Sequence, residues 1–471
     1  MIGKRIPSVA AEQRTFQELG GIPMMGILAF VLACTFLLFS PVWGGSKQSS
    51  TPGALVWQDQ GTTPNSGGGS IVASGKLILA TGWTDVDVSS GSYNYTLRAY
   101  QGSTGELVWS DSGVGLFNTS AQAGGRVFAA GTNIIGPDNT RPGFFMRAYN
   151  ANKGTFLWQV GNTTDVVVGL AATETTVYVV GWTIPQVEFL VRAYAANTGT
   201  VLWENQVPGQ GFSIAVAGNR VFTSGRDATN GFLLSAYNAK TGTLLWQHDT
   251  PEYLPGLATN GQRVFAAGST GSAPYNGHWL VRAYDAPTGT VLWEDIESNL
   301  APPGICNLPF DNPPIPCNDV ALEVDPYAGR LFAMGLSQNE AYGGTAVVIR
   351  AYQANTGTLL WNDSRLSTLA VPQIVGIHAQ GSQVFAISRN GNGYGGSNTA
   401  PDFSLRAYNA QTGAVNWEDQ LTTAWPSGFT VNFGLVFTVG SVGSWPEQFL
   451  EIQAFDAGGY APYVPQSSGK P

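Results

Sequence analysis

A short segment recurs through the chain, and this repetition constrains the fold more than any other feature. One copy reads RAYDAPTGTVLWED at residues 282–295. A tryptophan aligns the copies, and successive tryptophans lie 43 to 68 residues apart. Self-similarity with a period of about 50 residues is typical of β-propellers and solenoids. The eight aligned tryptophans are Trp57, Trp109, Trp158, Trp203, Trp246, Trp293, Trp361 and Trp417.

The recurring segment has the pattern of a β-hairpin. Apolar and polar residues alternate up to an Ala-Tyr pair, a turn follows that ends in Thr-Gly in most copies, and a second apolar stretch leads to the tryptophan. The glycine supplies the positive φ that the turn needs. An Asn or Asp after the tyrosine can cap the turn through its side chain.

A second apolar element precedes each hairpin, for example GRVFAAG at 125–131 and QRVFAAG at 262–268. Such β-branched and aromatic runs are typical of strands that are buried on both faces. A further short strand precedes each run, such as SIVAS at 70–74. The sequence therefore predicts an all-β fold, an eight-bladed β-propeller of four-stranded blades.

The two ends of the repeat region complement each other. The chain enters with only the fourth strand of a unit, around Trp57, and leaves with only the third strand, around Phe455. If these strands pair, they complete the last blade and leave no free edge at which other chains could aggregate. We therefore expect the ring to be closed by pairing of the N-terminal and C-terminal strands.

An uncharged stretch precedes the repeat region. No charged residue occurs from Gly20 to Trp43, and Lys4, Arg5 and Arg14 precede this stretch. It is long enough to span a bilayer as one helix. Positive charge on its N-terminal side predicts that this end stays in the cytoplasm and that the remainder is exported.

The fate of this segment has three alternatives: a retained transmembrane anchor, a cleaved export signal, or a lipoprotein signal through VLAC, which ends at Cys34. All three place the propeller on the periplasmic or extracellular side. The predicted domains are a cytoplasmic n-region at 1–19, a transmembrane anchor or export signal at 20–45, a linker at 46–51, the propeller at 52–458 and a flexible tail at 459–471.

Composition agrees with an all-β protein and excludes one class of partner. Glycine makes up 60 of 471 residues and charged residues only 11 %, against a typical charged share of about 25 %. This combination suits short strands joined by tight turns. The net charge is −9 and no Lys/Arg-rich run occurs, so nucleic-acid binding, which needs a basic surface, is not expected.

The A-Y-x-A-x-T-G-x-x-x-W hairpin resembles the pyrroloquinoline-quinone (PQQ) repeat of the quinoprotein dehydrogenase-like propellers, and the resemblance covers about residues 52–458. It implies that the eight aligned tryptophans dock each blade against its neighbour. The family contains enzymes as well as non-enzymatic scaffolds, such as the propeller lipoprotein of the bacterial outer-membrane assembly machinery. Fold alone therefore does not decide the function.

For a PQQ-dependent dehydrogenase of the methanol type, the resemblance would imply a vicinal Cys-Cys disulfide, a Ca²⁺ held by Glu, Asn and Asp, and an Asp base. The chain has no Cys-Cys dipeptide, and no residue can be assigned as a calcium ligand of that set or as the base. We therefore expect no catalytic and no cofactor-binding residue, because PQQ and Ca²⁺ have no support from ligand motifs. The sequence favours a non-enzymatic role.

Several residues outside the hairpins are candidates for special roles. Loop carboxylates at short spacing can bind Ca²⁺, although solvated loops carry such residues without any metal; the candidates are Asp85, Asp87, Asp311 and Asp319. Cys306 and Cys317 lie in a Pro-rich loop of an exported chain, which predicts a disulfide. His278 and His378 stand alone in strand-like contexts and are interpreted as structural.

Charged residues also recur within the hairpins. An arginine precedes the Ala-Tyr pair in six copies and a glutamate follows the tryptophan in three, so cross-strand ion pairs are expected. The residues are Arg98, Arg147, Arg192, Arg282, Arg350 and Arg406, with Glu204, Glu294 and Glu418.

Long loops between the second and third strands are rich in Gly, Asn, Ser and Tyr, and they share one face with the insertion at 300–318. Such loops commonly carry binding sites. We expect an envelope or extracellular protein partner on this loop face, membrane contact through residues 20–43, and a monomeric propeller. The leading hypothesis is a non-catalytic protein-binding scaffold; the alternatives are a PQQ-dependent alcohol or sugar dehydrogenase with non-standard ligands and a carbohydrate or small-molecule binding module. The long loops are 84–94, 132–143, 269–278, 336–345 and 389–402.

Overall fold

The structure is a computed structural model, and all the residues that it describes lie in the unit Gln48–Pro471. No helix long and apolar enough to cross a membrane occurs in the described part. The predicted anchor at 20–43 and the predicted disulfide between Cys306 and Cys317 lie outside the described residues. The described residues are 51–87, 92–134, 142–229, 231–270, 278–297, 320–325, 329–339, 344–366, 372–390, 403–421, 424–443 and 447–458.

The described residues form 31 β-strands and no helix, in six four-stranded sheets and one seven-stranded sheet, all with antiparallel neighbours. The first strands of the sheets, called the inner strands, are β2 (Ser66–Ser74), β6 (Leu116–Ala123), β10 (Asp165–Ala172), β17 (Tyr253–Thr259), β21 (Val320–Asp325), β25 (Pro372–Gln380) and β29 (Ala424–Asn432). The second strands are β3 (Leu77–Asp87), β7 (Arg126–Ile134), β11 (Thr176–Thr183), β14 (Arg220–Asp227), β18 (Arg263–Ser269), β22 (Arg330–Asn339), β26 (Gln383–Asn390) and β30 (Leu435–Val442). The third strands are β4 (Ser92–Gln101), β8 (Pro142–Asn150), β12 (Glu188–Ala195), β15 (Phe232–Asn238), β19 (Trp279–Asp285), β23 (Gly344–Gln353), β27 (Phe403–Asn409) and β31 (Phe449–Asp456). The fourth, or outer, strands are β5 (Leu107–Val114), β9 (Phe156–Asn162), β16 (Leu244–Thr250), β20 (Val291–Glu297), β24 (Leu359–Leu366), β28 (Val415–Leu421) and β1 (Leu55–Gln60).

The seven-stranded sheet arises because one strand serves two groups. Strand β13 (Val201–Ala217) pairs with β12 through Val201–Pro208 and with β14 through Gly209–Ala217. Its first half is therefore an outer strand and its second half an inner strand. We expected two separate strands here, but the strand continues through the Pro-Gly-Gln-Gly stretch at 208–211, where Gly209 has a φ of +138°.

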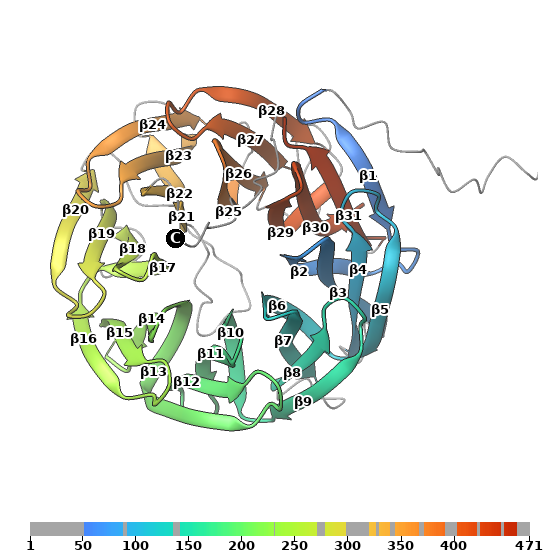
Figure 1. Ribbon diagram of the computed structural model, residues 1–471, viewed down its shortest axis with the longest axis horizontal. Coiled ribbons are helices and arrows are strands. Elements are labelled where there is room, and N and C mark those ends of the chain that lie inside the picture. Colours follow the sequence, from blue (N-terminus) through green and yellow to red (C-terminus); the bar gives the residue numbers. More distant parts are fainter. Residues whose placement is uncertain are drawn as a thin grey trace, which may run out of the picture. The chain divides into compact units, whose positions relative to one another are not determined.

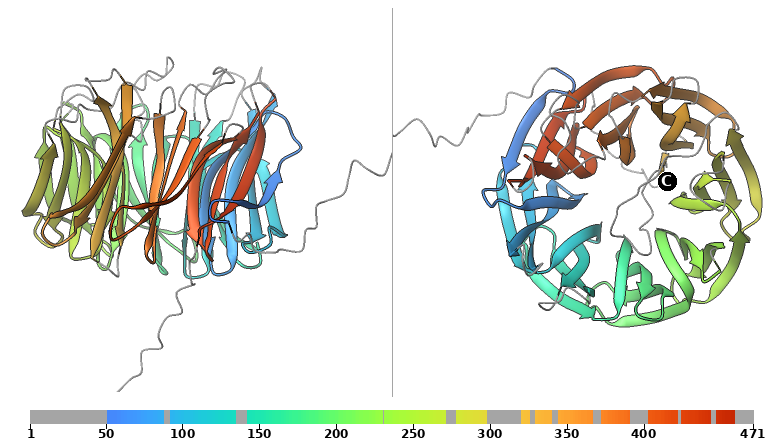
Figure 2. Two further views of the ribbon diagram at one scale, coloured as in Figure 1. Left: turned by 90° about the horizontal axis from the view of Figure 1, so that it is seen from above. Right: turned by 180° about the vertical axis from the view of Figure 1, so that it is seen from behind.

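The sheets are arranged side by side around a common centre, with the inner strands nearest to it (Figure 1). In the side view of Figure 2 the strands of successive sheets run between the two faces of this unit. This all-β arrangement of four-stranded antiparallel sheets is the architecture of a β-propeller, as predicted. Strand β1, from the start of the unit, pairs antiparallel with β31 from its end, Trp57 lying opposite Ala454.

The hydrophobic core lies between the sheets. Second strands are buried on both faces, as the apolar runs predicted; in β11 every residue from Thr176 to Gly181 is buried. Buried residues form eight clusters; seven are shared by two successive sheets, and the eighth lies between the two halves of the seven-stranded sheet. In one of them Phe128 of β7 packs with Val177 and Val179 of β11. Each sheet is therefore held by its neighbours on both sides.

Several strands extend further than the sequence suggested. Residues 84–94 were expected to be a loop, but β3 continues to Asp87 and β4 begins at Ser92. Likewise β22 reaches Asn339 and β23 begins at Gly344, within the expected loop 336–345. The hairpin ladder between the second and third strands continues into these polar segments because backbone pairing does not require apolar side chains.

Candidate binding site

Each aligned tryptophan contacts the segment that directly follows the next third strand along the chain, which in most cases is the hairpin turn of the following sheet. The indole Nε1 of Trp109 donates a hydrogen bond to the carbonyl oxygen of Ala151 at 2.9 Å, and the ring covers Gly154 of the same turn. A Cβ at Gly154 would lie 2.5 Å from Cδ2 of Trp109, and its φ is +67°. Glycine is therefore required here twice, by the turn and by the indole. The acceptors for the eight tryptophans are the carbonyl oxygens of Gly102, Ala151, Ala196, Ala239, Ala286, Ala354, Ala410 and Ala457.

The expected cross-strand ion pairs are confirmed. Arg282 contacts Glu294 at 2.8 Å and Arg406 contacts Glu418 at 2.9 Å. Arg192 pairs with Glu204 in the same way. These pairs join the third and outer strands of one sheet.

A second set of ion pairs, which the sequence analysis missed, joins neighbouring sheets. An Asp two positions after the tryptophan accepts hydrogen bonds from the Arg and Tyr of the following sheet. Asp295 Oδ2 lies 2.7 Å from Nη1 of Arg350 and 2.7 Å from the Tyr352 hydroxyl. Burial, together with this carboxylate, raises the pKa of Tyr352, which stays protonated and donates. The other Asp–Arg pairs of this kind are Asp59–Arg98, Asp111–Arg147 and Asp363–Arg406.

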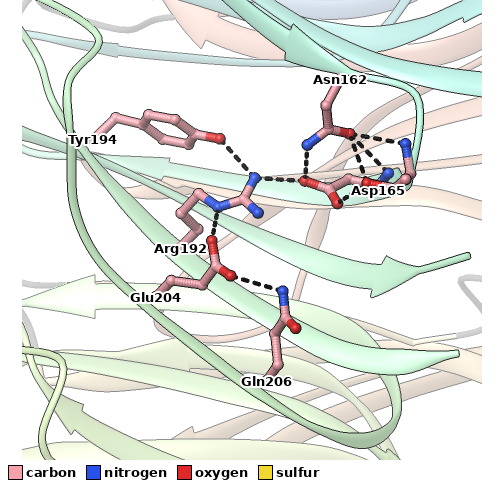
Figure 3. Close-up of polar contacts among 7 residues, drawn as sticks. Asn162, Asp165, Arg192, Tyr194, Glu204 and Gln206 are labelled. Atoms are coloured by element: carbon pink, nitrogen blue, oxygen red, sulfur yellow. Dashed lines mark hydrogen bonds and ion pairs between the residues drawn. The ribbon is translucent and has the colours of Figure 1, made fainter. Parts of the chain in front are cut away.

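One buried arginine of the repeat, Arg192, has a different set of partners, drawn in Figure 3. Arg192 is 8 % exposed. Its Nη1 lies 2.5 Å from Asp165 Oδ2 at the start of β10 and 3.0 Å from the Tyr194 hydroxyl, and its Nε donates to Glu204. Asn162 donates to the same Asp165 oxygen at 2.6 Å. All of these polar groups satisfy one another, so the cluster is structural and not open to a ligand.

The sheet that contains β1 and β31 departs from this pattern. Gln453 and Phe455 stand where other sheets have the Arg and Tyr, so Asp419 lacks these partners and burial raises its pKa. Two residues before Gln453 in β31, Glu451 occupies the position that Leu233 has in the third strand β15. It is 6 % exposed, its Oε2 has no hydrogen-bond partner, and burial raises its pKa to about 7.

A cavity of about 510 Å³ lies against the inner strands. Its volume falls within the range of about 300–1,000 Å³ that is usual for small-molecule sites. Six successive inner strands line it, together with Trp182 at the end of β11. The lining residues are Asn118, Thr119, Val168, Gly169, Leu170, Trp182, Phe212, Ser213, Ile214, Pro255, Gly256, Leu257, Val320, Ala321, Leu322, Ile374 and Val375.

The lining of this cavity does not fit a quinone cofactor with calcium. PQQ is a tricarboxylate, so a site for it must supply cationic donors, and Ca²⁺ requires several oxygen ligands, usually carboxylates. None of the residues that line the cavity has an ionisable side chain. Across the described residues, no group of three or more His, Cys, Asp or Glu side chains is placed to hold a metal ion.

The two histidines that were interpreted as structural, His278 and His378, both lie outside the cavity. His378 of β25 is half-buried; its Nδ1 is 3.8 Å from Glu323 Oε1 of β21, and its ring meets Phe429 edge-on. Burial lowers the pKa of His378, but its interaction with the Glu323 carboxylate outweighs this and raises the pKa above the ordinary value. His278 is exposed where β19 begins. Neither histidine lines the cavity.

The remaining predicted site residues are not placed. The calcium candidates Asp311 and Asp319 lie outside the described residues, as do the side chains of Asp85 and Asp87. The calcium site and the disulfide therefore remain predictions.

The four-stranded sheets and the repeated Trp–turn contact define a propeller with PQQ-like repeats. A family model described as outer membrane protein assembly factor BamB matches residues 142–299 and 277–432, which together are more than half of the chain. The chain belongs to this family. No curated protein sequence matches it.

Solved structures with the same fold share little sequence with the chain. Quinohemoprotein alcohol dehydrogenase from Comamonas testosteroni is 14 % identical, with a TM-score of 0.54 over 88 % of this chain and 78 % of that one. The corresponding enzyme ADHIIG from Pseudomonas putida HK5 is 13 % identical, with a TM-score of 0.53 over 91 % and 80 %. Saccharomyces cerevisiae Sqt1 is 11 % identical, with a TM-score of 0.54 over 86 % and 99 %. At such identities the likeness concerns the fold alone.

Proposed function

We propose that the chain is an exported, eight-bladed propeller that acts as a non-catalytic scaffold and binds another protein of the cell envelope. In this proposal the segment 20–43 anchors or exports it, the propeller is monomeric, and pairing of β1 with β31 closes the ring. Contacts between the inner strands support the closed ring. They run in order through β2, β6, β10, β13, β17, β21, β25 and β29, and β29 contacts β2.

The family match carries the binding role, because the matching family is described as an outer-membrane assembly factor. The surface of the propeller supports it. The two residues before the aligned tryptophan are exposed aliphatic or aromatic side chains in six successive outer strands; Leu359 and Leu360, for example, are 43 % and 42 % exposed. Exposed apolar side chains of this size are common at protein interfaces.

Cross-linking of the full chain in its own membrane tests this proposal. We expect one discrete envelope protein to be captured at a saturable level, and we expect deletion of the loop 300–318 to abolish the capture. The matched control removes the tail 459–471, which should leave capture intact. The proposal would be overturned if capture survived the deletion of 300–318. It would also be overturned if the intact chain captured no partner at a saturable level.

A further inference from the structure

Most inner strands carry a β-bulge, at which one residue is inserted relative to the second strand; β2 and β29, which do not line the cavity, have one as well. Five of the six inner strands along the cavity have such a bulge. A bulge interrupts the ladder and re-aims side chains, which is why bulges are frequent beside binding sites. The residues inserted at these bulges that line the cavity are Asn118, Val168, Phe212, Pro255 and Val375.

These inserted residues differ from sheet to sheet, whereas the tryptophan, the turn glycine and the core strands repeat. Polar, aliphatic and aromatic groups therefore face one asymmetric cavity. Phe212 also packs against Phe232 and Tyr253, each with ring centroids 6.3 Å away, which holds its ring in place. An asymmetric lining built on a symmetric frame is what selective recognition of one ligand requires.

Polar groups in the cavity remain available to a ligand. Within the described residues, the side chains of Asn118, Thr119 and Ser213 make no hydrogen bond. Along the cavity, five of the inner strands are edge strands of their sheets, and the second half of β13 pairs with β14 alone, so about half of their backbone N–H and C=O groups have no strand partner on the cavity side. These groups can donate to and accept from hydroxyls, and none of them carries a full charge.

We propose that this cavity is a binding site for a neutral carbohydrate of one or two sugar units. Trp182 and Phe212 provide aromatic surfaces against which the apolar face of a sugar ring packs, and Asn118, Thr119 and Ser213 hydrogen-bond its hydroxyls. An anionic ligand is disfavoured because a charge without a counter-ion would be desolvated in this lining. The site goes beyond the protein-binding role, because it uses the inner strands and not the loop face.

Calorimetric titration of the purified full chain with neutral mono- and disaccharides tests the proposal, with glucuronate as the acidic comparison. We expect saturable binding of at least one neutral sugar at one site per chain, and weaker or no binding of glucuronate. Trp182→Ala should weaken binding by about tenfold or more, and Asn118→Ala by about two- to tenfold.

Trp83→Ala is the matched control, because Trp83 occupies the same Gly-Trp-Thr position in β3 and does not line the cavity. It should leave sugar affinity unchanged. Circular dichroism and the unfolding temperature check that each variant is folded. Absence of binding by all neutral sugars, equal affinity for glucuronate, or equal losses in Trp83→Ala and Trp182→Ala would overturn the assignment. Capture of the envelope partner should be the same in all three variants, so the two proposals fail separately.

Discussion

At the residue scale, two separate requirements explain the glycine that ends the hairpin turns. The turn needs a positive φ, and the indole of the preceding sheet lies where a Cβ would be. Gly154 meets both demands, whereas Gly125 has a φ of +70° and nothing within 4 Å of its Cβ position. The two positions therefore separate backbone strain from the tryptophan contact.

Gly154→Ala should destabilise the protein by about 2–4 kcal/mol, because the left-handed conformation and the displaced Trp109 indole both contribute. Gly125→Ala should cost only about 1–2 kcal/mol, since the strain acts alone. Chemical denaturation followed by tryptophan fluorescence measures both. Equal losses would show that the indole does not depend on this glycine.

A second prediction at this scale concerns pH. The pKa of Glu451 is raised from 4.5 to about 7 in the folded protein, so between these values the folded state binds more protons than the unfolded state. Stability should therefore fall as pH rises from about 4.5 to 7, by on the order of 3 kcal/mol in total. Glu451→Gln should remove this decline and be the more stable protein at pH 8.

Glu106→Gln is the control for that measurement, because Glu106 is exposed and should leave the pH profile unchanged. Thermal unfolding at pH 5, 6, 7 and 8 is the readout. A wild-type profile that is flat across this range, or a decline that persists in Glu451→Gln, would contradict the assignment of the decline to Glu451.

At the scale of the elements, neighbouring sheets are joined by polar links as well as by tryptophan. The Asp111 carboxylate accepts hydrogen bonds from Tyr149 at 2.5 Å, from Arg147 at 3.0 Å and from Tyr95 at 3.3 Å. Asp111→Asn keeps the shape of the side chain but removes its charge. We expect a loss of about 1–2 kcal/mol in this partly exposed network, measured by urea denaturation.

Asp249→Asn serves as the comparison, because Asp249 is an exposed residue of an outer strand and, among the described residues, its side chain hydrogen-bonds only to Gln247 of the same strand. Its stability should stay within about 0.5 kcal/mol of wild type. A similar loss in both variants would mean that the sheet-to-sheet link at Asp111 contributes nothing specific.

The hairpins could be predicted because strands, turn and tryptophan are local in the sequence and recur. The links across sheets could not, because Asp111 and Arg147 stand 36 positions apart and Asp419 repeats the Trp-x-Asp spacing without an Arg to meet it. The cavity was also missed. Its inserted residues, such as Asn118 and Phe212, have no common sequence pattern, since a bulge is a property of the register between two strands.

At the scale of the whole molecule, strand β1 joins the two ends of the repeat region. Removal of residues 51–60 takes away the partner of β31 and the hydrogen bond from Trp57 to Gly102. Because loss of one buried tryptophan alone costs about 3–5 kcal/mol, we expect a larger loss here and aggregation through the freed edge of β31. Unfolding temperature and light scattering measure both effects, and removal of 459–471 is the control.

A peptide of residues 51–62 added in trans should partly restore the unfolding temperature of the variant that lacks β1. An unfolding temperature equal to that of the tail-deleted control would contradict the closed ring. A loss that the peptide does not reverse would place the effect elsewhere than in this strand pair.

The central claim is that the repeat builds a scaffold and that its uncharged cavity does not support quinone chemistry. Titration of the full chain with PQQ in the presence of Ca²⁺, with a parallel assay of dye-linked alcohol and sugar oxidation, tests this most directly. We predict no saturable PQQ binding and no turnover, because the cavity lining supplies neither cations for the cofactor's carboxylates nor ligands for the metal. One PQQ bound per chain, with turnover that depends on it, would contradict the claim.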